Sequence, residues 1–100
     1  MRKDILTLQN LINSGMAWRL EGRVGREAMR ALEAGDCMLG TERQRDYYGN
    51  MVPSRYDVAP GSKGSRQLVV SENGESHASE LELVPNEFMV ENFISNLEEV

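Results

Sequence analysis

Four arginines in the first third of the chain have the spacing that best suggests binding chemistry. They follow one another at intervals of four, three and four residues: Arg19, Arg23, Arg26 and Arg30. On a continuous helix they would lie within about 60° of arc, with aliphatic residues on the opposite side. Such a row predicts an anion-binding site, either for nucleic-acid phosphate or for an acidic protein surface.

The same row has a purely structural interpretation. Glu27 lies between Arg23 and Arg30 at helical spacing, so ion pairs of a few tenths of a kcal/mol each could leave an ordinary solvated face. Gly22 and Gly25 could also break the helix and remove Arg19 from the row. A helix-turn-helix fits residues 4–34 loosely, since a turn that contains glycine separates the two helices. The sequence pI of about 4.8 argues against it, because nucleic-acid-binding domains are usually basic.

The last third of the chain has the opposite charge. All eleven lysines and arginines lie at or before Arg66, whereas residues 67–100 contain eight acids and no base, a formal charge of −8. We predict an acidic partner-binding face at four glutamates: Glu80, Glu82, Glu91 and Glu98. Such a face could mimic the phosphates of a nucleic acid in a basic groove of a partner, or it could be the plain polar side of a strand and a helix.

Groups able to catalyse a reaction are few. Cys37 is the only cysteine and His77 the only histidine, so we expect no disulfide, no zinc site and neither a metal nor another cofactor. We interpret Cys37 as a small buried hydrophobe and His77 as an exposed residue beside a turn. Residues 60–65 lack the order of a phosphate-binding loop, which leaves a turn with an exposed lysine. We therefore predict that the protein is not an enzyme.

Hydrophobic periodicity predicts the elements that position these residues. Apolar residues at helical spacing predict helices over 4–13 and 24–34, closed by Gly15 and Gly35. The Asn-Gly pair at 73–74 and the alternating residues 80–84 predict a β-hairpin that pairs 66–71 with 79–84. A last helix is expected over 86–98.

The segment between residues 40 and 65 is long for a loop without structure. Three tyrosines are expected to pin it to the domain by burying their rings: Tyr47, Tyr48 and Tyr56. Trp18 is expected to lie mostly buried between the first two helices. We therefore predict one small α+β domain over residues 1–100, with a helical part (1–39), a pinned loop (40–65) and a hairpin plus helix (66–100).

The N-terminus and the overall composition bear on location. Polar residues interrupt what would have to be the apolar stretch of a signal peptide, and no apolar run approaches the roughly 18 residues of a membrane span. With a single cysteine, these features favour a cytoplasmic protein without a membrane partner.

Two segments carry a resemblance to known sequences. Residues 15–26 read Gly-x-Ala-Trp-x-Leu-x-Gly-x-x-Gly-Arg, and residues 46–55 read Asp-Tyr-Tyr-Gly-Asn-x-Val-Pro-Ser-Arg, followed by Pro-Gly-x-Lys-Gly-Ser at 60–65. Over about residues 10–65 the chain resembles small, uncharacterised bacteriophage proteins. The resemblance implies a protein of an infected bacterial host's cytoplasm that binds host machinery, as anti-CRISPR inhibitors do. It assigns no functional residue.

The function predicted first is a non-enzymatic, phage-type binding protein that occludes a host protein or a protein–nucleic-acid complex through its acidic surface. The alternative is a nucleic-acid-binding regulator that uses the arginine row. A small enzyme is the third and weakest alternative. The oligomeric state stays open.

Overall fold

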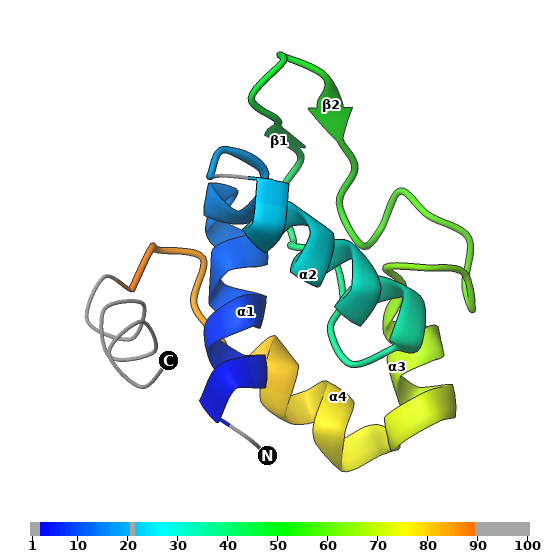
Figure 1. Ribbon diagram of the computed structural model, residues 1–100. Helices are drawn as coiled ribbons and strands as arrows, with labels where there is room; N and C mark the ends of the chain where they lie inside the picture. The colour runs from blue at the N-terminus through cyan, green and yellow to red at the C-terminus, as the bar shows by residue number, and fades with distance from the viewer. Residues whose placement is uncertain (1–2, 21, 90–100) are drawn as a thin grey trace.

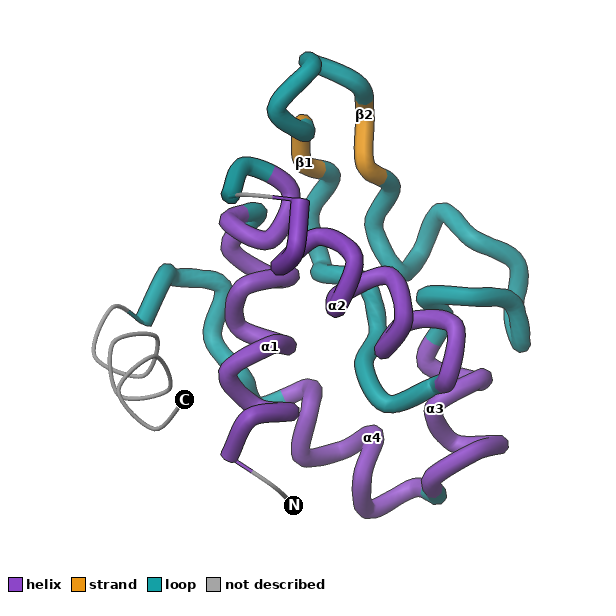
Figure 2. Tube along the Cα trace, viewed as in Figure 1, coloured by secondary structure: helices purple, strands orange, loops and turns teal. Residues whose placement is uncertain are grey.

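Helix α1 (Lys3–Ser14) is buried on most of its sides, and the other elements are arranged around it (Figure 1). The computed structural model describes residues 3–20 and 22–89. Helices make up most of the described chain, and the strands form only a short hairpin at one end (Figure 2). The predicted class, a small α+β domain, is confirmed.

The N-terminal half follows the predicted helices closely. Helix α1 ends at Ser14, and Gly15 follows with φ 84°, the left-handed conformation that favours glycine. A single 3-10 turn, η1 (Met16–Trp18), comes next, and helix α2 then runs over Gly22–Ala34. The helical conformation is therefore interrupted before α2, and Arg19 does not lie on the helix that carries the other arginines. Gly35, with φ 75°, closes α2 as predicted.

The hairpin lies at a place that the sequence pattern did not indicate. Strand β1 (Gln44–Arg45) pairs antiparallel with strand β2 (Met51–Val52), with Gln44 opposite Val52 and Arg45 opposite Met51. This two-stranded ribbon projects beyond one end of α2 (Figure 1). It belongs to the segment that was predicted to be a loop.

The predicted hairpin of 66–71 with 79–84 is wrong, because these residues form two helices, α3 (Arg66–Asn73) and α4 (Glu75–Glu82). Ser65 starts α3: its Oγ accepts the N–H of Leu68 at 3.1 Å, which satisfies a free donor of the first turn. A strand would place Leu81 and Leu83 on one side, yet Leu81 is fully buried and Leu83 is 83% exposed. Helical packing has overridden local β propensity.

The predicted helix over 86–98 does not begin where expected. Residues 86–89 form no helix, and the rest of the predicted helix lies outside the described residues. Asn86 does not cap a helix; its Nδ2 donates to Thr41 Oγ1 at 3.0 Å. The segment 84–89 instead runs along α1, which holds it through side-chain amides.

Two apolar clusters lie against α1. The larger one joins residues of α1, η1, α2 and the chain after α2: Leu11, Ile12, Ala17, Ala28, Ala31, Leu32, Cys37 and Leu39. The smaller one joins Met38 to residues of α3 and α4: Val69, Ala78 and Leu81. Ile5 of α1 packs against both clusters, so this helix connects the two parts of the core.

A buried network of side-chain amides on α1 ties distant segments together. Gln9 Nε2 donates to Asn13 Oδ1 and to the carbonyl of Met38, both at 2.8 Å, and Gln9 Oε1 accepts the Met38 N–H at 2.9 Å. Asn13 Nδ2 donates to the carbonyl of Val84 at 3.0 Å. Both amides are buried, with Gln9 0% and Asn13 2% exposed. The apolar periodicity of α1 did not predict this buried polar face, because it considers only apolar residues.

The tyrosines do not pin the middle segment, contrary to expectation. Tyr47, Tyr48 and Tyr56 are 76%, 84% and 72% exposed. The segment is held by other groups: Arg55 is buried, and its Nε donates to the carbonyl of Leu39 at 2.7 Å. Burial lowers the pKa of this guanidinium from its ordinary value.

Asp57 orders the turn around Arg55. Its Oδ2 accepts the N–H and the Oγ–H of Ser54 at 2.9 and 3.0 Å. Arg43 adds two charge-assisted bonds to the same carboxylate, both at 2.9 Å. These bonds hold the pKa of Asp57 well below its usual range, with the Arg43 bond as the largest cause.

Trp18 is only partly buried, although it packs against the larger cluster as expected. It lies on η1, between the end of α1 and the start of α2. The expected place, at the junction of the first two helices, is therefore correct, but part of the indole stays accessible at the surface.

We expect Asn13→Ala to lower the free energy of unfolding by about 2–3 kcal/mol, because it leaves the partly buried carbonyl of Val84 and part of the buried Gln9 amide without these partners. Urea unfolding followed by Trp18 fluorescence measures the change. Gln67→Ala, an exposed amide on α3, is the control and should change stability by less than about 0.5 kcal/mol. Equal effects of the two variants would contradict a central role for the network.

We expect Asp57→Asn to speed tryptic cleavage after Arg55, because it removes the anchor of the turn that keeps this arginine buried. Mass spectrometry of short digests measures the rate at this bond. Tyr48→Ala should leave the rate unchanged, since the tyrosine ring is exposed. If Tyr48→Ala exposed the bond and Asp57→Asn did not, the tyrosines would be the anchor after all.

Candidate functional site

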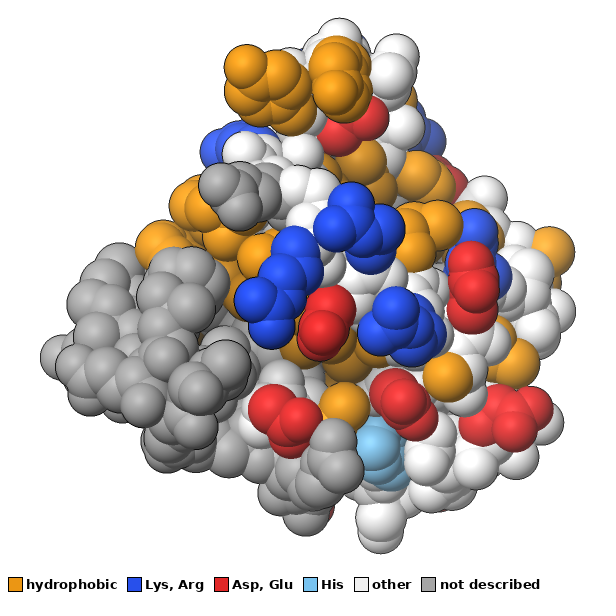
Figure 3. Space-filling model, viewed as in Figure 1, with side chains coloured by type: hydrophobic (Ala, Val, Ile, Leu, Met, Phe, Trp, Pro, Cys, Tyr) orange, Lys and Arg blue, Asp and Glu red, His pale blue; other side chains and the backbone are white. Residues whose placement is uncertain are grey.

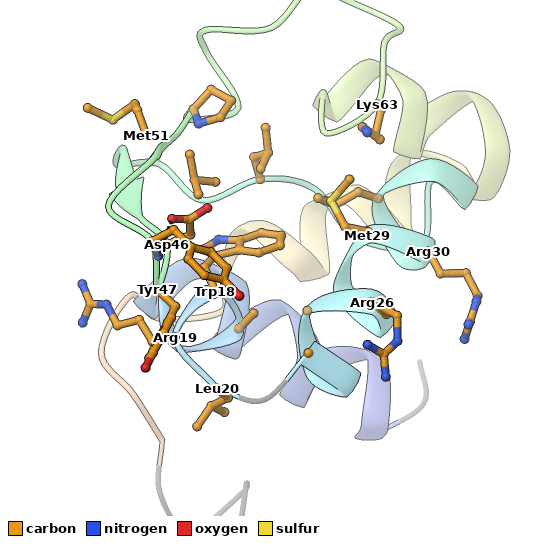
Figure 4. Close-up of a pocket in the computed structure, with 18 of the residues that line it drawn as sticks. Trp18, Arg19, Leu20, Arg26, Met29, Arg30, Asp46, Tyr47, Met51 and Lys63 are labelled. Carbon is orange, nitrogen blue, oxygen red and sulfur yellow. Dashed lines mark hydrogen bonds between the residues drawn. The ribbon is translucent and has the colours of Figure 1, made fainter.

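A groove of about 1060 Å³ lies between α2 and the β1–β2 hairpin (Figure 4). We call it the α2–hairpin groove. Residues of α2 form one wall, including Gly25, Arg26 and Met29, and hairpin residues 46–48 and 51–52 form the other. Trp18, Tyr47 and Arg19 lie together at one end, and Met29, Arg30 and Lys63 at the other (Figure 4).

The floor of the groove is built around Trp18. The 3-10 turn packs against α2 near Gly25, where a Cβ would lie in ordinary van der Waals contact, 3.5 Å, with the carbonyl oxygen of Ala17. The Trp18 Nε1 atom is buried and finds no hydrogen-bond partner in the described residues. A buried indole N–H normally has a partner, so the tryptophan is held here by packing and by geometry rather than by its polar atom.

The hairpin wall is ordered by the side chain of Asp46. Its Oδ1 accepts the N–H of Tyr48 at 2.9 Å and that of Asn50 at 2.8 Å, which closes the turn. The N–H of Tyr47 donates to the carbonyl of Trp18 at 3.0 Å and so attaches the hairpin to the floor. The turn therefore presents two exposed rings in a defined arrangement.

The two tyrosine rings contact each other edge to face. Their centroids are 5.3 Å apart and their planes meet at 84°. Beside them Met51 is 52% exposed. Orange atoms mark this exposed apolar tip above the charged face of α2 in the space-filling view (Figure 3). Large exposed aromatic groups on a rigid turn are typical of a binding surface.

Four cationic side chains line the same groove, and all are exposed: Arg19, Arg26, Arg30 and Lys63. Three of them belong to the predicted arginine row, and the structure brings Arg19 to the groove although it lies off the helix. Arg23 is exposed on α2 but does not line the groove. The charged ends of Arg26 and Arg30 lie at the outer edge of the groove, away from Trp18 (Figure 4).

The structural interpretation of the arginine row is met in part: the residues on α2 form an exposed face, but the expected ion pairs through Glu27 are not seen among the described residues. Across residues 3–20 and 22–89, no ion pair or hydrogen bond engages the side chains of Arg23, Arg26 and Arg30. Acidic side chains lie among the basic ones on this face (Figure 3). Two carboxylates, Glu33 and Asp46, also line the groove. The groove thus has four cations and two anions.

The predicted acidic face is only partly described. Glu80 and Glu82 are exposed on α4, whereas Glu91 and Glu98 lie outside the described residues. Arg66 Nε contacts Glu82 at 2.8 Å, and its guanidinium also pairs with Glu75. The Arg66 bond lowers the pKa of Glu75. One base thus engages two of the acids, and the use of this face by a partner stays a prediction.

The candidate catalytic residues lie apart from the groove. Cys37 is buried, as predicted, and burial, aided by Asp36 and Asp4, raises the pKa of its thiol to about 12. His77 lies on α4 rather than beside a hairpin turn, and its Nε2 lies 2.9 Å from the carbonyl oxygen of Asp36. Within the described part of the chain, no three His, Cys, Asp or Glu residues gather as metal ligands would.

The sequence reasoning missed the hairpin side of the site. Tyr47, Tyr48 and Met51 were assigned to a pinned loop, and Lys63 to an isolated turn. The signal that could have found them is Asp46, whose carboxylate favours a tight turn that exposes the two following rings. The contact between this turn and Trp18 joins residues almost thirty positions apart, and no local pattern reports it.

The comparisons with known proteins give no match: no protein-family model, no curated protein and no solved structure matches the chain. None of the helices in the described ranges is both long and apolar enough to cross a membrane. The function is therefore argued from the α2–hairpin groove.

We expect the Cys37 thiol to be about a thousandfold less ionised than a free thiol at pH 8, because its pKa lies near 12 rather than at the ordinary 9.0. Reaction with a disulfide reagent should be very slow in the native protein and fast in denaturant. The unfolded thiol ionises first, so the free energy of unfolding should fall as the pH rises above about 9. Equal native and unfolded reaction rates would contradict the burial of this thiol.

Proposed function

We propose that the protein is a non-enzymatic binding protein that holds an anionic segment of a macromolecule in the α2–hairpin groove. The observation that supports this proposal is the combination, along one groove, of exposed aromatic rings with four cations that pair with no side chain among the described residues. Arginine, tyrosine and tryptophan are the residues most often found at the energetic centre of binding surfaces.

The local charge favours an anionic partner although the whole chain has a formal charge of −5. Charges are screened over about 10 Å at 0.1 M salt, so a ligand in the groove responds mainly to the groove's own side chains. Asp46, one of the two anions there, already accepts two backbone N–H groups through its Oδ1. Within residues 3–20 and 22–89, the side chains of the groove's cations have no such partner.

The rigidity of the walls also supports binding. The Asp46 turn and the Tyr47–Trp18 bond order the hairpin before any partner arrives. A preordered surface loses less conformational entropy on association, which favours affinity. The exposed arginines are flexible enough to reach a partner's charges from the rim.

This proposal keeps the non-enzymatic class that the sequence predicts and changes the surface used. The acidic face was predicted first, yet Arg66 neutralises part of it. The arginine row was the alternative, and the groove adds Lys63 and three aromatic residues to it. The geometry therefore favours the cationic surface.

We expect the protein to be retained on heparin, a generic polyanion, at low salt and to elute earlier after Arg26→Glu or Arg30→Glu. Each change reverses one groove charge. Arg23→Glu is the matched control, since it makes the same charge change on α2 outside the groove. The salt concentration at elution measures the effect.

Two results would count against the proposal. One is passage of the unmodified protein through heparin without retention at low salt. The other is an equal shift for Arg23→Glu and Arg26→Glu, which would reduce the effect to net charge. Circular dichroism of each variant checks that the helices remain folded.

A further inference from the structure

We infer that the anionic segment is single-stranded DNA, whose bases stack on the aromatic residues of the groove while its phosphates lie along the cationic rim. This inference rests on the proposed function and names its partner. Proteins that bind single strands combine a positively charged groove with aromatic side chains on which bases stack. Both parts are present here, in one groove.

The arrangement of the tyrosines favours separated bases. Tyr47 and Tyr48 are 76% and 84% exposed, so both rings are accessible to a base. Their planes are nearly perpendicular, at 84°. Two bases stacked on these rings could not remain stacked on each other, an arrangement that a single strand allows and a duplex resists. The hairpin also projects beyond α2, which hinders insertion of that helix into a major groove (Figure 1).

The lining of the groove favours bases over a peptide. It contains Trp18, Tyr47, Tyr48 and two methionines, but no Ser, Thr, Asn, Gln or His. An extended acidic peptide would need acceptors for its backbone N–H groups. The side-chain acceptors of the lining are only the tyrosine hydroxyls and the carboxylates of Glu33 and Asp46, which repel acidic residues. The flat apolar faces of bases have no such requirement.

The same lining favours deoxyribose over ribose. The 2′-hydroxyl of RNA is the group by which proteins recognise it, through side chains that donate or accept hydrogen bonds. Apart from the buried indole N–H of Trp18, the neutral hydrogen-bonding side chains of the lining are only the two tyrosine hydroxyls, because its other polar side chains are four cations and the carboxylates of Glu33 and Asp46. A lining with so few neutral polar side chains offers a 2′-hydroxyl little selective contact.

The experiment measures the fluorescence anisotropy of a labelled twelve-residue thymidine oligonucleotide at several salt concentrations. Four rim cations predict that log affinity falls with log salt with a slope of up to about −3, since each phosphate contact on a single strand contributes about 0.7. Quenching of Trp18 emission on binding places the strand in the groove.

Variants separate stacking from charge. Tyr47→Ala and Tyr48→Ala should each weaken binding about tenfold with the salt slope unchanged. Arg26→Gln and Arg30→Gln should each reduce the slope by about 0.7. Tyr56→Ala and Arg23→Gln are the matched controls, an exposed tyrosine and an exposed arginine outside the groove, and should change neither quantity.

Further probes of the same length decide the partner. Weaker binding of the duplex, of the uridine ribonucleotide and of a labelled polyglutamate peptide supports the inference. Tighter binding of any of these three, or no loss with the tyrosine variants, overturns it. If heparin retention depends on Arg26 and Arg30 while the thymidine strand does not bind, the inference fails and the proposed function survives. If heparin retention is also absent, both fail.

Discussion

The buried amides of α1 are the constraint on which the rest of the structure depends. Gln9 and Asn13 lie in the interior, and burying unpaired amides would cost several kcal/mol. They are satisfied only when the chain after α2 supplies Met38 and the chain after α4 supplies Val84. Asn10 adds bonds from its Nδ2 to the carbonyls of Pro85 and Glu87. One helix thus fixes two distant segments, because without them its buried amides would lack hydrogen-bond partners.

The same helix positions the groove. The carbonyl of Asn13 accepts a bond from Gln44 Nε2 at 3.2 Å, which fixes the start of the hairpin against the end of α1. Gly15 then turns the chain with positive φ, and a Cβ there would lie 2.6 Å from Gln44 Oε1. The turn places Trp18 where its carbonyl meets the N–H of Tyr47. The floor and one wall of the groove are therefore consequences of how α1 ends.

The bases and the excess acids lie in different parts of the chain, and they make different contacts. Five of the eleven bases lie on α2 or line the groove and are unpaired within the described residues, whereas Arg66, the last base, pairs across α3 and α4 with Glu75 and Glu82. Exposed ion pairs of this kind add little stability. Free arginines beside aromatic rings have a clearer use in binding, which is why the groove, rather than the acidic third, carries the proposed function.

Local patterns sufficed for the first two helices, their glycine stops and the buried cysteine, because each depends on residues within a few positions of one another. They failed for residues 66–84, where β-prone residues form helices because Ser65 caps α3 and Leu81 is buried against Met38 and Val69. They also failed for the tyrosines. These rings are exposed because Arg55 and Asp57, rather than the tyrosines, hold the loop. The groove itself could not be predicted, since its floor, its walls and Lys63 come from segments that only packing on α1 brings together.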